Sequence, residues 1–372
     1  MAYVIRPADR TSFKQCRRQW DLSSRNRRNL ERVEPARGVL DLDEAVRDAL
    51  AVYYFPGMWE WNRAIVLPLV RNAFEQSVAR QVGSGTVTDD TAAKRALGLR
   101  LLEAYFAWAP SVDRFSPVRV ETDFAAHVPD LARPGYDLAS PAVGEVRYEG
   151  RIPMLVIDEA EVYWIVEHRL VTGAWTDLDM LLLDDEPVAA CWAWERFYLG
   201  MRIAGTVITE IRIDIDLEPV PIPSDAPAAA AGPGHRRMYV QAASEPSAAL
   251  EQTGEGPFRR TRIPRSRREL DAVGERIALE ALDMIAPGLW VYPNPSPEHC
   301  RACSYRAPCL VLTAGEDVRP MLADQYRERP PEEPEEGRLG GVTWGMNRGA
   351  MPMESRAREG QRLPRRGAGD DT

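Results

Sequence analysis

The stretch 148–170 predicts a β-hairpin, and this hairpin constrains the fold more than any other part of the chain. Two runs rich in β-branched and aromatic residues flank a short acidic turn at 158–161. In the second strand, Glu167 and Arg169 are two residues apart, so their side chains point to the same face. The first strand contains Pro153, which is unusual inside a sheet because proline has no amide proton to give a neighbouring strand.

Size and composition exclude a membrane-spanning protein. With 372 residues, the chain can bury a large core in one large domain or two modest ones. It has no run of about 18 apolar residues, so no membrane span is predicted. The polar, arginine-rich N-terminus lacks the apolar segment of a secretory signal. We therefore expect a cytoplasmic protein, whose five cysteines serve metal binding or burial rather than disulfides.

The charge pattern leaves nucleic-acid binding open. A net charge of −9 argues against a general nucleic-acid binder. Arginines nevertheless gather in the first 40 residues and in a second run, whose members include Arg259, Arg260, Arg262, Arg265 and Arg267. Such a local patch can bind phosphate despite an acidic total. Solvated helix faces explain the same pattern equally well.

The order of the predicted elements indicates an α/β or α+β fold. One domain is expected over 1–316, followed by a disordered tail over 317–372 that is low in apolar periodicity and carries an acidic proline run. The parts of the domain are, in order, a helix from Thr11-Ser12 to about Leu22, a helical part at about 40–112, a core at about 113–220, a loop insertion at about 222–257, a helix from Arg268 to about Met284, and a cysteine segment at 293–312. Within the core we expect strands at 118–124 and 206–217 and a helix at 181–199.

Three cysteines form the strongest motif. Cys300, Cys303 and Cys309 have the spacing C-x₂-C-x₅-C. Three clustered thiols in a reducing compartment indicate a metal site. A 4Fe–4S cluster needs four thiolates, and zinc also suits this donor set, with Cys16 or His299 as the fourth ligand. The spacing alone does not decide between the two.

The hairpin, a helix with a Tyr-Tyr pair at 53–54 and the cysteine pattern together resemble the PD-(D/E)XK nucleases, in the RecB-like and CRISPR-associated iron–sulfur exonuclease branch. The resemblance implies a mixed central β-sheet flanked by helices. It also implies a metal site for Mg²⁺ or Mn²⁺ built from Gly-x-x-Asp and Glu-x-Lys. Glu167 matches the glutamate of that pattern, and Glu121 matches a glutamate that many relatives carry ahead of the hairpin. Pro153, Arg169 and Arg47 stand where the family has aspartate, lysine and histidine.

The same resemblance implies which cofactor the cysteines bind. Its iron–sulfur members take one cysteine from an N-terminal helix and three from a C-terminal segment, which implies a 4Fe–4S cluster on Cys16, Cys300, Cys303 and Cys309. Such a cluster staples the two chain ends across the nuclease core. In these relatives, a segment like the arginine run lies near the DNA groove, so the run is our predicted nucleic-acid contact.

Three functions follow as hypotheses. The preferred one is a DNA-binding, iron–sulfur protein of nuclease fold with lost or impaired hydrolysis, because arginine cannot accept a proton near neutral pH and repels a cation. The second is an active exonuclease that uses Mg²⁺ or Mn²⁺ at a rearranged site with Glu121, Glu167 and a displaced acid. The third is a scaffold subunit that docks a protein partner through its C-terminal tail.

Overall fold

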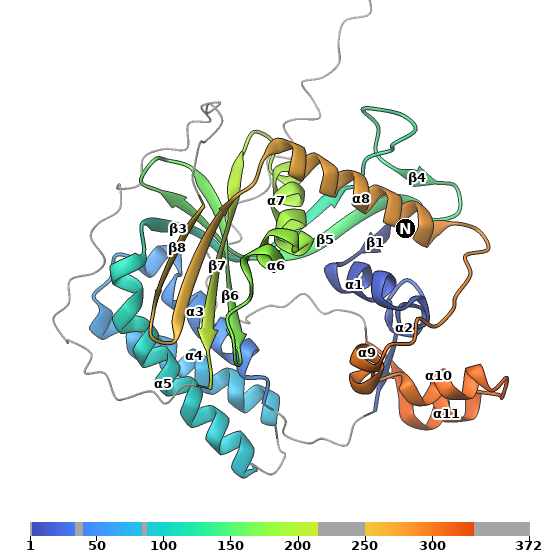
Figure 1. The fold of residues 1–372 in the computed structure, drawn as a ribbon, viewed down its shortest axis with the longest axis horizontal. Helices are drawn as coiled ribbons and strands as arrows, with labels where there is room; N and C mark the ends of the chain where they lie inside the picture. Colours follow the sequence, from blue (N-terminus) through green and yellow to red (C-terminus); the bar gives the residue numbers. More distant parts are fainter. Residues whose placement is uncertain (1, 34–39, 84–87, 215–249, 331–372) are drawn as a thin grey trace, which may run out of the picture.

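The strand β5 (Gly144–Asp158) is the centre of the fold in the computed structural model, which describes residues 2–33, 40–83, 88–214 and 250–330 (Figure 1). It pairs with four strands, which are β1 (Tyr3–Ile5), β3 (Phe115–His127), β4 (Ala139–Ser140) and β6 (Tyr163–Val171). Beyond β6 the sheet continues through β7 (Ile203–Arg212), β9 (Phe258–Pro264) and β8 (Glu251–Glu255). Two strand pairs, β1–β5 and β6–β7, are parallel and the others are antiparallel. The predicted mixed sheet is therefore confirmed.

The predicted hairpin is also present. β5 and β6 run antiparallel, with register pairs from Ile157–Tyr163 to Met154–Val166. Their turn is held by Asp158, whose Oδ1 accepts the backbone N–H groups of Ala160 and Val162, each at 2.9 Å. Pro153 lies next to Met154, just beyond the last of these pairs. This position is expected for a residue that cannot donate a hydrogen bond to the neighbouring strand. Beyond Val166, β6 continues alongside β7, so the two hairpin strands separate at the level of Glu167.

Three long helices cover one face of the sheet (Figure 1). They are α3 (Leu42–Tyr53), α4 (Arg63–Val82) and α5 (Asp89–Val112), with the short 3₁₀ helix η1 (Pro56–Met58) after α3. Asp41 caps α3 by accepting the N–H of Glu44 at 3.1 Å. The buried side chains of these helices form one hydrophobic core with Met154, Trp164 and Val166 of the sheet. The predicted helical part at about 40–112 is confirmed.

The other face is covered by helices from the N-terminal, middle and C-terminal parts of the chain. These are α1 (Pro7–Gln15), α2 (Arg17–Ser23), α6 (Leu178–Leu183), α7 (Asp185–Phe197) and α8 (Arg267–Ile285). α8 begins with a reciprocal cap between Ser266 and Glu269. A second core joins Trp20 and Trp194 with Leu155 and Ile165 of the hairpin. The architecture is thus a helix–sheet–helix sandwich.

A small third core joins the chain ends. Leu22, Tyr305 and Tyr326 are buried together beside Cys303. The surrounding elements are α9 (Pro297–Ala302), α10 (Arg306–Thr313), α11 (Arg319–Gln325) and the strand pair β10 (Tyr326–Glu328) with β2 (Leu30–Arg32). The expected disorder from 317 onward is therefore wrong for 317–330, because Tyr326 has a buried site among these elements. Residues 331–372 lie outside the described part.

Three predicted boundaries need correction. Thr11 and Ser12 lie inside α1, and Cys16 has extended backbone that separates α1 from α2. The helix expected at 181–199 is divided into α6 and α7 at Asp184, which caps α7. β8 occupies part of the loop insertion expected at 222–257, where it pairs with β9. The rest of that insertion, up to 249, lies outside the described residues.

Candidate functional site

Glu167 and Arg169 form an ion pair on the side of β6 that faces α6 and α7. Arg169 donates from Nε to one carboxylate oxygen of Glu167 at 2.8 Å and from Nη2 to the other at 3.1 Å. Its Nη2 also lies 2.7 Å from Oδ2 of Asp184, at the α6–α7 junction. Burial opposes the charged form of Arg169, but Glu167 and Asp184 outweigh it and raise the Arg169 pKa. The guanidinium therefore stays charged between two carboxylates.

A third carboxylate belongs to the same neighbourhood. Burial raises the pKa of Glu186, and the negative charges of Glu167 and Asp184 raise it further. The second contribution is the repulsion expected between neighbouring like charges. Arg169 offsets part of the repulsion. The face of β6 that carries Glu167 is thus an acidic site with a resident cation.

The residue between them, His168, points to the opposite face, because successive side chains of a strand alternate. It is 7 % exposed and packs against Tyr54, the residue that follows α3, and against Tyr105 of α5. Its Nε2 lies 2.8 Å from the hydroxyl of Tyr105. The sheet therefore separates His168 from Glu167 and Arg169.

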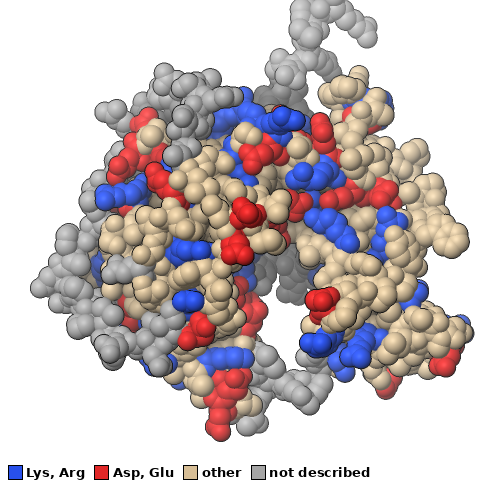
Figure 2. All heavy atoms as spheres, viewed as in Figure 1, with Lys and Arg blue, Asp and Glu red and all other residues tan. Residues whose placement is uncertain are grey.

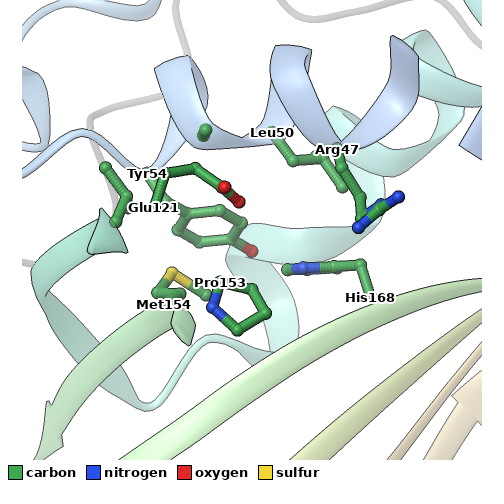
Figure 3. A pocket seen from close by; sticks show the side chains of 9 residues that line it. Arg47, Leu50, Tyr54, Glu121, Pro153, Met154 and His168 are labelled. Atoms are coloured by element: carbon green, nitrogen blue, oxygen red, sulfur yellow. The ribbon is translucent and has the colours of Figure 1, made fainter. Parts of the chain in front are cut away.

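The other predicted site residues meet at a small cavity on this opposite side (Figure 3). Arg47 of α3, Glu121 of β3 and Pro153 of β5 line it together with Tyr54 and His168. Its volume of about 20 Å³ is enough for roughly one water molecule. The structure thus brings together three of the five predicted active-site positions and leaves Glu167 and Arg169 outside this cavity.

Glu121 has strained backbone. Its φ of +42° is in the left-handed region that residues other than glycine rarely adopt. It lies between the register pairs Val120–Met154 and Thr122–Ile152, and so opposite Pro153. Its carboxylate Oε2 is 3.9 Å from Nη1 of Arg151. The lack of an N–H on Pro153 removes one ladder hydrogen bond here, which leaves room for the irregular conformation.

A buried polar network extends from this cavity into the core. Tyr105 lies 2.7 Å from the hydroxyl of Tyr54, and Tyr54 in turn is 3.1 Å from the carboxylate of Asp113. Arg260 of β9 donates to Asp113 at 2.6 Å and to the Tyr105 hydroxyl at 3.3 Å. Burial, assisted by the charge of Arg260, lowers the pKa of His168 to about 3, so the imidazole is neutral. Burial raises the pKa of Asp113, although Arg260 partly offsets it.

Sequence reasoning missed this network. In the sequence, Asp113 looks like a polar residue at the end of a helix. Arg260 belongs to an arginine run that was predicted to form a surface patch. A signal was present in the alternation of β6, where His168 occupies a position whose neighbours on the same face, Trp164 and Val166, are buried in the α3–α5 core. A polar residue at a core position requires a hydrogen-bonded partner.

The four predicted cluster ligands lie in the same region, where the chain ends meet. Burial raises the pKa of the Cys303 thiol, and Cys16, Cys300 and Cys309 each raise it further. Cys16 also lies against the cysteine segment, because its Sγ is 3.5 Å from the backbone N–H of Asn294. All five cysteines are free thiols, and Cys191 is buried away from this group in the core with α7 and α8.

Several hydrogen-bond donors point at these sulfurs. The backbone N–H of Asn294 approaches Cys16 Sγ at 3.5 Å, and that of Ser296 approaches Cys300 Sγ at 3.4 Å. Arg18 donates toward Cys309 Sγ at 3.7 Å and to its carbonyl at 3.2 Å. Four thiols with such donors suit the chemistry of a thiolate-bound metal or cluster. Within the described ranges, however, no three His, Cys, Asp or Glu side chains are arranged closely enough to hold a metal ion.

The arginine run is not gathered on one surface. Arg260 and Arg265 are each 6 % exposed, and Arg265 donates to the carbonyls of Leu181 and Leu182, both at 3.0 Å. The other members are bound to acidic side chains, with Arg259 on Glu210, Arg262 on Asp158 and Arg267 on Glu195. Each predicted nucleic-acid contact therefore has a partner inside the protein, which the spacing of the run did not reveal.

The surface charges are mixed. On the face shown in Figure 2, basic and acidic side chains are interspersed, and the surface is hollowed between the main body and the cysteine segment. Exposed arginines without a partner in the described part of the chain include Arg268, at the start of α8, and Arg301 and Arg306, beside the cysteines. None of the described helices is both long and apolar enough for a membrane crossing.

Comparison with known proteins adds no family to this geometry. Neither a protein-family profile nor a curated protein matches the sequence.

Proposed function

We propose that this protein is a nuclease-like, DNA-binding protein of PD-(D/E)XK type that carries a 4Fe–4S cluster and has lost or impaired metal-dependent phosphodiester hydrolysis. The observation that carries the loss of hydrolysis is the ion pair of Arg169 with both carboxylate oxygens of Glu167, at 2.8 and 3.1 Å. Mg²⁺ is held chiefly by carboxylate oxygens. Here those oxygens already bind a cation that cannot deprotonate near neutral pH.

The remaining positions support the same conclusion. Pro153 offers no ligand atom from its side chain, and Arg47, whose Nε lies 3.0 Å from Asp43, adds positive charge near Glu121. Glu121 lines the cavity and Glu167 does not, so a rearranged active site that uses both glutamates lacks support. Asp184 and Glu186 are the displaced acids nearest Glu167, and Arg169 would have to leave before a divalent cation could bind there.

The cofactor part of the proposal assigns the cluster to Cys16, Cys300, Cys303 and Cys309. When bound, a 4Fe–4S cluster would supply covalent bonds that hold the N-terminal segment to α9 and α10. The chain's own contribution is to bring the thiols together through the small core of Leu22, Tyr305 and Tyr326. Asn294, Ser296 and Arg18 direct hydrogen bonds at the sulfurs. Zinc is the alternative occupant.

For DNA binding, the exposed arginines outside the run are the better candidates. Arg301 and Arg306 have no described partner, so their charges are available to phosphate groups. Arg265, by contrast, is fixed by two backbone carbonyls. We therefore place the phosphate contacts of the proposed function on the cysteine segment rather than on the arginine run.

One purified sample tests the chemical part. Single- and double-stranded DNA are incubated with the protein and Mg²⁺ or Mn²⁺, and iron, sulfide and zinc are measured on the same preparation. The proposal expects no degradation above a metal-free control and about four iron and four sulfide per chain, the composition of one 4Fe–4S cluster. Metal-dependent degradation that disappears with Glu167→Ala would establish an active nuclease instead. Stoichiometric zinc without sulfide would replace the cluster.

A second measurement separates DNA binding from a scaffold role. The affinity for DNA should fall with increasing salt, because each phosphate contact releases bound counterions. The double variant R301E/R306E should weaken binding at least tenfold, whereas R100E, an exposed arginine on α5, serves as the matched control. Unchanged or absent DNA binding in the wild type and both variants would favour the scaffold hypothesis.

A further inference from the structure

Residues 325–330, the last that the structure describes, return to the N-terminal segment (Figure 1). β10 pairs antiparallel with β2. Two further backbone hydrogen bonds extend this strand pair at its ends. The N–H of Val33 donates to the carbonyl of Gln325 at 2.8 Å, and the N–H of Arg329 donates to the carbonyl of Asn29 at 2.9 Å. These bonds join parts of the chain that are about as far apart in sequence as Asn29 and Arg329, which are 300 positions apart.

Side chains fix the end of β10 as well. The carbonyl of Arg329 accepts a hydrogen bond from Nδ2 of Asn29 at 3.0 Å, and Nη1 of Arg329 donates to the carbonyl of Ser23 at 2.8 Å. Asn29 has a φ of +52°, a conformation that asparagine tolerates better than most residues. Arg25 donates to the carbonyl of Pro330 at 2.9 Å. The return of the chain is therefore held by both backbone and side-chain bonds.

Two stacked tyrosines connect this strand pair to the cysteine segment. The ring centres of Tyr305 and Tyr326 are 5.7 Å apart, and the two residues are 6 % and 5 % exposed. The Tyr326 hydroxyl donates to the carbonyl of Ser304 at 2.6 Å, and the Tyr305 hydroxyl donates to the carbonyl of Leu30. Both hydroxyls are thus satisfied at the edge of a buried aromatic pair, an arrangement that stabilises the contact between the chain ends.

The cysteine segment is also anchored at its start. The N–H of Arg18 donates to the carbonyl of Tyr292 at 3.1 Å, and Nδ2 of Asn294 donates to the carbonyl of Gln15 at 2.9 Å. Arg18 donates in addition to the hydroxyl of Thr313, the last residue of α10, at 2.8 Å. The helices α9 and α10 are therefore tied to the N-terminal segment before and after the cysteines. None of the bonds named here uses a cysteine sulfur.

We propose that residues 325–330 are a latch that keeps the cysteine segment docked on the N-terminal segment without help from a metal or cluster. The bonds of the latch come from the backbone and from ordinary polar and aromatic side chains, so they do not require the thiols to be bound. Cys303 packs against the tyrosine core. The latch thus positions the cysteine segment beside Cys16 before any cofactor enters.

This inference differs from the staple that the nuclease resemblance implies, in which the cluster itself joins the chain ends. It concerns the metal-free chain and does not depend on which cofactor the cysteines bind. A purified protein without iron, sulfide or zinc would therefore reject the proposed cofactor but leave the latch to be tested in the same way.

Hydrogen exchange of the full chain tests the latch. Iron and zinc are removed with a chelator, the thiols are kept reduced, and mass spectrometry with fragmentation follows the amides of Val33 and Arg329. Both should exchange about a hundredfold or more slowly than in an unfolded chain, because each is hydrogen-bonded across the latch. Exchange at the unfolded rate would mean that the chain ends need a cofactor to stay together, which would overturn the proposal.

A matched pair of arginine variants identifies the residues responsible. Arg329→Ala removes the bond to the carbonyl of Ser23 and should speed exchange of the Val33 amide about fivefold or more. Arg319→Ala is the control, because Arg319 belongs to the same part of the chain but its side chain is 87 % exposed and pairs with Asp317. This variant should exchange at the wild-type rate.

A third variant probes the tyrosine core. Tyr326→Ala removes a buried ring and should speed exchange of the Val33 amide about fiftyfold or more. Slow exchange of the β5 amides in the same experiment checks that the main body of each variant stays folded. Equal rates for Val33 in all three variants would show that residues 325–330 do not hold the chain ends together.

Discussion

Arg169 binds Glu167 through two hydrogen bonds of 2.8 and 3.1 Å, and so the carboxylate of Glu167 is neutralised by its neighbour two residues along β6. The pair is about a quarter exposed, with side-chain exposures of 27 % for Arg169 and 28 % for Glu167. Bidentate pairing of this kind is specific to arginine, because lysine presents a single ammonium group. The loss of activity that we propose can therefore be reversed in principle by side-chain changes.

The first prediction is a gain of function. In the variant Arg169→Lys, the guanidinium that binds both carboxylate oxygens of Glu167 is removed, so Glu167 and the nearby Asp184 and Glu186 can supply oxygen ligands for Mn²⁺. We expect Mn²⁺-dependent cleavage of DNA ends at least tenfold above the wild type, measured by release of labelled nucleotides. The same variant with Glu167→Ala is the control and should return to the wild-type level. Equal activity in Arg169→Lys with and without Glu167→Ala would show that Glu167 takes no part.

The second prediction concerns the buried pair of Arg260 and Asp113. Their side chains are 6 % and 0 % exposed, and Nη1 of Arg260 lies 2.6 Å from Oδ1 of Asp113. Removal of one partner leaves a buried charge without compensation, so Arg260→Met should lower the free energy of unfolding by about 3–5 kcal/mol in urea denaturation.

A double variant provides the control for that pair. With Asp113→Asn added to Arg260→Met, neither side chain is charged, so the loss of stability should be clearly smaller than the sum of the two single losses. Additive losses would mean that the pair is not coupled, and that Arg260 acts through its contacts with Trp108 and Phe115 instead.

The hairpin illustrates how much of the site could be predicted from sequence. Strand alternation correctly placed Glu167 and Arg169 on one face, because that depends only on local geometry. The same alternation placed His168 on the other face, but its partners Tyr54 and Tyr105 come from helices more than 60 residues away. The packing of the helices on the sheet decides which charged side chains form ion pairs, such as Arg260 with Asp113. For this reason the arginine run looked like a surface patch in the sequence.

The third prediction tests the cysteine group. Cys16→Ser should abolish bound iron and visible absorbance, because it removes the only proposed ligand from the N-terminal segment. Cys191→Ala is the matched control, since Cys191 is buried in the core with α7 and α8, and should retain the iron content of the wild type. Iron and sulfide analysis of both variants gives the measurement. Loss of iron in the Cys191 variant alone would reject the ligand assignment.

The fourth prediction concerns the pH dependence of stability. Burial and Arg260 lower the pKa of His168 from 6.5 to about 3 in the folded protein. Between these two values the unfolded chain binds a proton that the folded protein does not, so stability falls as the pH falls below 6.5. From neutral pH to pH 5 this one group should cost about 2 kcal/mol, by single-site linkage.

The variant His168→Gln isolates this contribution. Glutamine keeps a hydrogen-bond acceptor for Tyr105 but does not titrate, so the variant should lose less stability than the wild type between pH 7 and pH 5, whatever its stability at neutral pH. Urea denaturation at several pH values compares the two slopes, and acidic groups common to both proteins cancel in the difference. Parallel slopes would mean that the imidazole is not held neutral by its burial between Tyr54 and Tyr105.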